Sequence, residues 1–132
     1  MMKLISSQPK WLASLIILVI ASLLIGSCVP ANEPPVISSL TANEEWIAPA
    51  GICQVECIAL DPDGDSLSYI WSASGGNISG EGSVVTWIAP DAPSAYTITV
   101  KVTDGRGGEA TTPLTINVVA INHPGYSHFS FR

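Results

Sequence analysis

Three carboxylates fall within five residues of this chain, in the segment 61–65 with the sequence DPDGD. Acids this close repel one another unless a cation or hydrogen-bond donors compensate them. Calcium prefers six to eight oxygen ligands, carboxylates among them, so Asp61, Asp63 and Asp65 are candidate calcium ligands. The same residues suit a tight turn, because Asp caps turns, Pro fixes φ and Gly tolerates positive φ. The turn alone is the simpler interpretation, and weak calcium binding is the alternative.

A second set of potential ligands is the pattern Cys53-x3-Cys57 with His123-x4-His128, which matches the spacing of a Cys2His2 zinc site. The two cysteines lie in a segment of alternating hydrophobicity, and residues four apart in a strand are about 13 Å apart. That separation is too long for one zinc ion, and for a disulfide, which needs Cα atoms within about 7 Å. We therefore expect both thiols to be small core residues, with an intermolecular bridge through Cys53 left open.

Catalytic motifs are missing from the sequence, which has no G-x-S-x-G elbow, no H-E-x-x-H and no phosphate loop. The sequence therefore predicts that the protein is not an enzyme and requires no cofactor, with the weak calcium binding considered above as the alternative. Trp46 and Trp87 are the aromatic residues least clearly assigned to a core, and each begins a WIAP tetrapeptide. We interpret both tetrapeptides as strand ends stopped by Pro. Core packing is the favoured interpretation of both Trp residues, and stacking of an exposed Trp on a sugar is the alternative.

The elements that must position these residues are β-strands. After the N-terminal region the hydrophobic residues alternate with a period of two, which is typical of half-buried strands. The inward faces comprise Cys53, Val55, Cys57 and Ala59; Leu67, Tyr69 and Trp71; Tyr96, Ile98, Val100 and Val102; and Leu114, Ile116 and Val118. Turn-forming residues separate these segments, and no helical periodicity interrupts them. The pattern predicts an all-β antiparallel sandwich of about seven strands.

A sandwich of this topology places the loop 61–65 and the loop 104–108 at one end, together with the start of the first strand. Asp104 would then join the three acids of the first loop as a fourth calcium ligand, and Arg106 can pair with an acid across the two loops. The loop is not an EF-hand, since the sixth and twelfth positions counted from Asp61 are Ser66 and Ser72, not Gly and an acid. We expect the turns 49–51, 74–76 and 90–94 and the C-terminal tail at the opposite end.

Cys57 and Trp71 stand fourteen residues apart on consecutive strand-like segments, as the B-strand Cys and C-strand Trp of immunoglobulin-type sandwiches do. Tyr96 resembles the conserved Tyr at the start of strand F, and the position of the second Cys is then Ile98. The resemblance implies a scaffold that lacks one half of the inter-sheet disulfide, a bond that contributes about 2–4 kcal/mol. Packing of Trp71 against Ile98 and Val55 would replace it.

The stretches DPDGDSLSYIWSASGG, VVTWIAP and YTITVKVTDGRGG, within residues 34–119, resemble bacterial surface domains of the polycystic-kidney-disease (PKD) type. The resemblance rests most on Trp71-Ser72-Ala73 after the third strand and on Val102-Thr103-Asp104 near the end of strand F. It implies an immunoglobulin-like fold and a role as a spacer, an adhesion unit or a substrate-presenting appendage, and only rarely catalysis.

The N-terminus has the pattern of a secretory signal, with Lys3 and Lys10 followed by an apolar run over residues 11–26. The run is shorter than the roughly 20 residues of a spanning helix. Residues 24–28, LIGSC, resemble a bacterial lipobox, in which a peptidase cuts before a Cys that carries lipid, so the resemblance implies lipidation of Cys28. An uncleaved anchor is the alternative. We expect a signal helix over 1–27, a linker over 28–35, the sandwich over 36–120 and a tail over 121–132.

Residues 28–132 hold three basic residues against eleven acidic ones, a formal charge of −8. Without a basic patch to neutralise phosphates, nucleic acid is not expected as a partner. The sequence predicts a protein of the cell envelope, anchored by lipid outside the cytoplasmic membrane. Its expected role is structural or adhesive, with weak contacts to a surface protein or polysaccharide. The alternative is a carbohydrate-binding module that uses Trp46 or Trp87.

Overall fold

The computed structural model describes residues 28–120, and within them every regular element is a β-strand. The strands are β1 (Val36–Ala42), β2 (Trp46–Ile47), β3 (Ile52–Leu60), β4 (Ser68–Ala73), β5 (Asn77–Ser79), β6 (Val84–Ile88), β7 (Ser94–Thr103) and β8 (Glu109–Val118). The expected signal helix over 1–27 and the tail over 121–132, with His123 and His128, lie outside the described residues. In the described part of the chain, no helix has the length and apolar character needed to cross a membrane.

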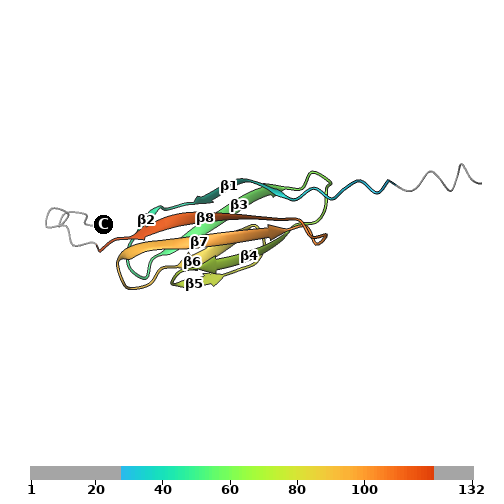
Figure 1. Cartoon of the computed structure of the whole chain (residues 1–132). Helices are drawn as coiled ribbons and strands as arrows, with labels where there is room; N and C mark the ends of the chain where they lie inside the picture. Colours follow the sequence, from blue (N-terminus) through green and yellow to red (C-terminus); the bar gives the residue numbers. More distant parts are fainter. Residues whose placement is uncertain (1–27, 121–132) are drawn as a thin grey trace, which may run out of the picture. The chain divides into compact units, whose positions relative to one another are not determined.

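The strands form two four-stranded sheets that face one another (Figure 1). One sheet has the order β1-β3-β6-β5 and the other the order β2-β8-β7-β4. All pairings are antiparallel except the short one between β2 and β8, which is parallel. The expected all-β immunoglobulin-like sandwich is therefore confirmed. The structure has eight strands instead of about seven because β2 and β5, of two and three residues, are too short to produce an alternating pattern.

The core lies between the sheets and comes from the alternating positions. Every second residue of β3 from Cys53 to Cys57 and of β7 from Ile98 to Val102 is buried. These side chains form two clusters, one around Val55, Trp87 and Ile98, the other around Cys57, Val100 and Val102. Trp71 packs against both clusters and so joins them. The period-two pattern thus identified the face of each long strand that is removed from water.

The two ends of the sandwich carry the groups of loops expected from the sequence. The β3–β4 loop, the β7–β8 loop and the segment that enters β1 lie together at one end, where Asn32 contacts Asp104 and Glu33 contacts Asp63. The turn before β3 and the β6–β7 loop meet at the other end, where the amide of Ala50 donates to the carbonyl of Pro90. We call the first the N-terminal end and the second the distal end.

Candidate functional site at the N-terminal end

The β3–β4 loop is a turn that its own aspartate holds closed. One carboxylate oxygen of Asp61, Oδ1, accepts hydrogen bonds from the amides of Asp63, at 2.9 Å, and Asp65, at 3.1 Å. The amide of Gly64 donates to the carbonyl oxygen of Asp61 at 3.2 Å. Gly64 has a φ of 78°, a conformation that Gly adopts without the steric cost of a Cβ atom. The turn interpretation of DPDGD is therefore correct at the level of the backbone.

The same turn brings three carboxylates together. Oxygen atoms of Asp61, Asp63 and Asp65, one from each, all lie within 4.8 Å of one another. The second oxygen of Asp61, Oδ2, is buried and has no hydrogen-bond partner among the described residues. A buried, unpaired carboxylate oxygen carries a desolvation cost that a bound cation would remove. The chemistry of this donor set suits calcium, a hard cation that accepts carboxylate oxygens in flexible geometry.

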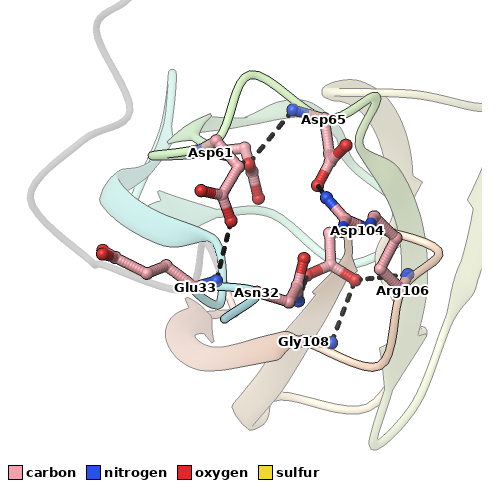
Figure 2. Close-up of polar contacts among 8 residues, drawn as sticks. Asn32, Glu33, Asp61, Asp65, Asp104, Arg106 and Gly108 are labelled. Atoms are coloured by element: carbon pink, nitrogen blue, oxygen red, sulfur yellow. Dashed lines mark hydrogen bonds and ion pairs between the residues drawn. The ribbon is translucent and has the colours of Figure 1, made fainter. Parts of the chain in front are cut away.

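Asp104 lies near the three clustered aspartates, but both of its carboxylate oxygens accept hydrogen bonds from other residues (Figure 2). It is 4 % exposed, and its Oδ1 accepts from the amides of Arg106, at 2.7 Å, and Gly108, at 2.9 Å. Its Oδ2 accepts from the side-chain amide of Asn32 at 2.6 Å. The hydrogen bond from Asn32, followed by those from the two backbone amides, lowers the pKa of Asp104. Its carboxylate therefore closes the β7–β8 loop and fastens the entering chain, and it is not one of the three clustered ligand groups.

Two further contacts tie the loops together. The guanidinium of Arg106 lies 3.1 Å from Oδ2 of Asp65, an ion pair across the β3–β4 and β7–β8 loops. The hydrogen bond and charge of Asp65 raise the pKa of Arg106, which stays protonated. The amide of Glu33 donates to Oδ2 of Asp63 at 2.7 Å. Arg106 and the backbone of the entering chain thus compensate Asp65 and Asp63 from two sides of the first loop, and Oδ2 of Asp61 is left unpaired within the described part of the chain (Figure 2).

Asn32 and Glu33 are the residues of this site that sequence reasoning missed. They fall in a segment that the sequence suggested was only a linker, yet the compact unit that holds the strands begins at Asn32. The available signal was a pair of polar residues directly before Pro34-Pro35, since two consecutive prolines restrict the chain that carries them. In the structure the segment before these prolines carries Asn32 and Glu33 into hydrogen-bond contact with the two loops.

The two candidate sugar-stacking residues have opposite environments. Trp87 is 0 % exposed, packs on Tyr96 with ring centroids 5.9 Å apart, and donates from Nε1 to the carbonyl of Gly75 at 2.9 Å. It offers no face to a ligand, which confirms the favoured core-packing interpretation for Trp87 and removes it as a candidate binding residue. Trp46 is 64 % exposed, which corrects the favoured interpretation that it packs in the core. It lies on β2, whose pairing with Asn117 and Val118 places it near the distal end.

The immunoglobulin-like features are present with one change. The hydroxyl of Tyr96 donates to the carbonyl of Ala92 at 2.9 Å, the contact of a tyrosine corner. Ile98 is fully buried in the same cluster as Val55, and the partly buried Trp71 packs against that cluster, as expected. Cys57 belongs to the other cluster, with Val100 and Val102, so it is not the residue opposite Ile98.

Both strand cysteines are inert core residues in the described structure. Cys53 and Cys57 are each 1 % exposed, and neither is in a disulfide. Burial raises the pKa of both thiols, and the charge of Glu44 raises that of Cys53 further. A thiol buried to this degree cannot reach a second chain, which argues against the intermolecular bridge through Cys53 that the sequence left open.

Comparison with known proteins agrees with this architecture. A family model described as a bacterial Ig domain matches residues 32–117. Among solved structures, the chain is similar to the PKD1 domain of Vibrio anguillarum Epp, with 24 % sequence identity and a TM-score of 0.54. That similarity covers 68 % of this chain and 99 % of the other, and at this identity it shows the fold alone. A comparison with curated proteins found no match.

The matched region includes every strand apart from the last residue of β8, and it begins at Asn32, where the compact unit begins. The family match and the structural similarity together support an Ig/PKD-type domain. The family match suggests a structural or adhesion-type module in an extracellular or surface-exposed location, and domains of this family are typically non-catalytic. Because the family model covers more than half of the chain, the chain belongs to the bacterial Ig domain family.

Proposed function

We propose that the protein is a lipid-anchored module of the cell surface that mediates weak contacts with a protein or polysaccharide through its distal end. The observation that supports this orientation is the fastening of the entering chain to the loops of the N-terminal end. Asn32 and Glu33 are bonded to Asp104 and Asp63, so the point where the leading segment joins the sandwich is fixed. Cys28 precedes Asn32 by four residues, a span of at most about 14 Å.

With a lipid on Cys28, this short reach holds the acidic loops close to the membrane and turns the distal end outward. A single acyl chain binds a membrane only marginally, so stable anchoring requires several chains. The test of the anchor is mass spectrometry of the protein extracted from membranes. We expect residue 28 to be the first residue and to carry lipid mass, and a Cys28→Ala variant to leave the membrane fraction. An unmodified Cys28 behind an intact leader would refute the anchor.

The second candidate function is carbohydrate binding through Trp46, because its exposed indole stands near the distal end. Sugar stacking on an indole changes its fluorescence, whereas the buried Trp87 does not respond. Titration with soluble polysaccharides therefore tests this function, with Trp46→Phe as the matched variant. A spectral change that survives in Trp46→Phe would exclude Trp46 as the platform, and no change with any polysaccharide would leave the protein-contact function as the proposal.

We also propose that the carboxylates of Asp61, Asp63 and Asp65 bind calcium weakly and stiffen the N-terminal end. The support is the close group of ligand oxygens and the unpaired, buried Oδ2 of Asp61. Ligand binding to the folded state alone raises its stability, so millimolar calcium should raise the melting temperature.

Asp63→Asn should suppress this rise, while Asp91→Asn, which removes an exposed acid in the β6–β7 loop, should retain it. Equal rises in the two variants would indicate general screening of the acidic surface and not a site. No shift at several millimolar calcium in the unmodified chain would refute calcium binding.

A further inference from the structure

The four edge strands of the two sheets are protected to different degrees against pairing with a strand from another molecule. An edge strand with free backbone groups pairs readily with another strand, and proteins prevent this with bulges, prolines, charges or very short strands. The edge strand β1 has a register shift between Ile37 and Ser39. The edge strands β5 and β2 have three and two residues, and β8 behind β2 carries Pro113.

The remaining edge, β4, has none of these protections. Its six residues, SYIWSA, include no proline and no charged side chain. Its pairing with β7 runs without a register shift from Ser68 opposite Thr103 to Ala73 opposite Ile98. Figure 1 shows β4 at the margin of its sheet, with β7 as its neighbour on one side. Ile70 in the middle of the strand is 58 % exposed.

The backbone of β4 presents free groups on the side away from β7. The amide of Ser74 donates to the carbonyl of Thr97, at 2.9 Å, just beyond the end of the strand. In an antiparallel ladder the backbone N–H and C=O groups of successive residues point alternately toward and away from the partner strand. The backbone groups of the even-numbered residues of β4 therefore point toward β7, and those of Tyr69 and Trp71 point toward the free edge. Among the described residues, no backbone–backbone hydrogen bond outside the ladders reaches these outward groups. The described part of the chain's own backbone therefore leaves them unpaired.

The sequence around this edge is nearly a palindrome. Residues 66–74 read SLSYIWSAS, with Ile70 at the centre. Serines stand two and four positions away on both sides, aromatic residues one position away, and Leu67 and Ala73 three positions away. A strand that reads similarly in both directions presents the same partners to a second, antiparallel copy of itself. An antiparallel pairing of two copies about Ile70 is isologous, with one surface contacting itself, and this sequence places serine opposite serine and Ile70 opposite Ile70 with no like charges facing each other.

We propose that the free edge of β4 pairs with β4 of a second copy of this chain, in antiparallel register about Ile70. In this register Ile70 lies opposite Ile70 of the second copy, and Ser68 lies opposite Ser72. Tyr69 and Trp71 of the two copies exchange the outward backbone hydrogen bonds, since their groups face the free edge. The pairing joins the two sheets that contain β4 into one continuous sheet of two copies.

The antiparallel direction decides where the two N-terminal ends lie, and this step rests on the proposed lipid anchor at Cys28. A strand of ten residues, such as β7, is about 33 Å long, so the two N-terminal ends are separated by roughly one domain length. The stretch from Cys28 to Asn32 spans about 14 Å at most, too short to return an inverted copy to the same membrane. With the distal end turned outward, as in the proposed function, the pairing therefore joins copies anchored in two facing membranes.

The pairing is tested by disulfide formation in the full chain in detergent, with glutathione disulfide as the oxidant. Directly opposite residues in non-hydrogen-bonded positions have Cα atoms about 4.5 Å apart, which suits a disulfide. Ile70→Cys should therefore form a covalent dimer. Cys53 and Cys57 are buried, and the unmodified chain serves as the control for cross-linking through Cys28.

The matched controls are Ser68→Cys and Ser72→Cys, which lie on the same face of the same strand. In the proposed register each lies about 13 Å from its own counterpart, so neither variant should dimerise alone. Mixed together, they should give a heterodimer, since Ser68 faces Ser72. We expect at least a tenfold excess of dimer for Ile70→Cys and for the mixture over either control alone. Equal dimer in all samples would indicate random collision and overturn the register.

The facing-membrane arrangement is tested with phosphatidylcholine vesicles that carry the full chain. Vesicles with the unmodified chain should cluster, and vesicles with Ile70→Glu should not. In the monomer Lys101 lies opposite position 70 on β7, so a glutamate there faces a cation, but in the pair it faces a second glutamate. Absence of the Ile70→Cys disulfide overturns the pairing, whatever is found at Cys28. A disulfide in detergent without vesicle clustering overturns only the facing-membrane arrangement.

Discussion

The two WIAP segments offer a comparison in which identical local sequences have different surroundings. Trp87→Phe and Trp46→Phe make the same chemical change in the same tetrapeptide. Trp87 is fully buried and its Nε1 donates to the carbonyl of Gly75, whereas Trp46 is 64 % exposed. We expect the first substitution to destabilise the domain strongly and the second to have little effect.

The expected size follows from the contacts. Full burial of an indole removes about 150–250 Å² from water, which at about 25 cal/mol per Å² contributes about 4–6 kcal/mol. Phenylalanine keeps most of this, but it loses the hydrogen bond to Gly75, about 1 kcal/mol, and leaves a void worth about 1–2 kcal/mol. Trp87→Phe should therefore cost about 2–3 kcal/mol, and Trp46→Phe at most about 0.5 kcal/mol, as for a surface substitution.

The assay is thermal unfolding of the full chain followed by circular dichroism, supported by urea denaturation. A domain of this size changes its melting temperature by about 4–8 °C per kcal/mol, so Trp87→Phe should lower it by about 8–24 °C. Trp46→Phe should leave it within a few degrees. Equal effects of the two substitutions would refute the reasoning, since they would mean that burial and the hydrogen bond to Gly75 do not distinguish the sites.

Three further predictions concern the N-terminal end and the thiols. Because the pKa of Asp104 is lowered in the folded state, its ionised carboxylate stabilises the fold above its ordinary pKa of 3.8, and this contribution is lost as the pH falls below that value. Asp104→Asn should therefore flatten the fall in unfolding free energy at these low pH values, measured by urea denaturation. Gly108→Ala should destabilise the domain by about 1–3 kcal/mol, because the new Cβ would meet the Asp104 carboxylate, while Gly64→Ala, with open space around it, should cost only the strain of positive φ. Cys53 and Cys57 should react with a thiol reagent only after unfolding; rapid reaction in the folded protein would contradict their burial.

The sandwich could be predicted from the sequence because its long strands alternate with a strict period of two. Each of β3, β7 and β8 buries the face that the pattern indicated, and the turn residues mark where the strands end. The backbone of the DPDGD turn was predictable for the same local reason, since Asp, Pro and Gly each restrict or extend the allowed dihedral angles of their own positions. These features depend on residues near one another in the chain.

The assignments that required the tertiary structure all depend on contacts between distant segments. WIAP has the same local preferences at both positions, but β6 lies inside its sheet and β2 at an edge, so one Trp is buried and the other exposed. Asp104 was grouped with the other acids, yet Asn32, 72 residues away, binds its carboxylate. The resemblance to immunoglobulin-type sandwiches gave Ile98 as the second Cys position, but Cys57 packs in the cluster of Val100 and Val102.

The sequence by itself determined the long strands, their buried faces and the two groups of loops, because dihedral preference and hydrophobic period are local properties. Only the tertiary structure decided which acids keep free oxygens, which Trp reaches solvent and which strand edge stays open. Those outcomes depend on which neighbour occupies each position, and a single strand carries no information about the segment that will pack beside it.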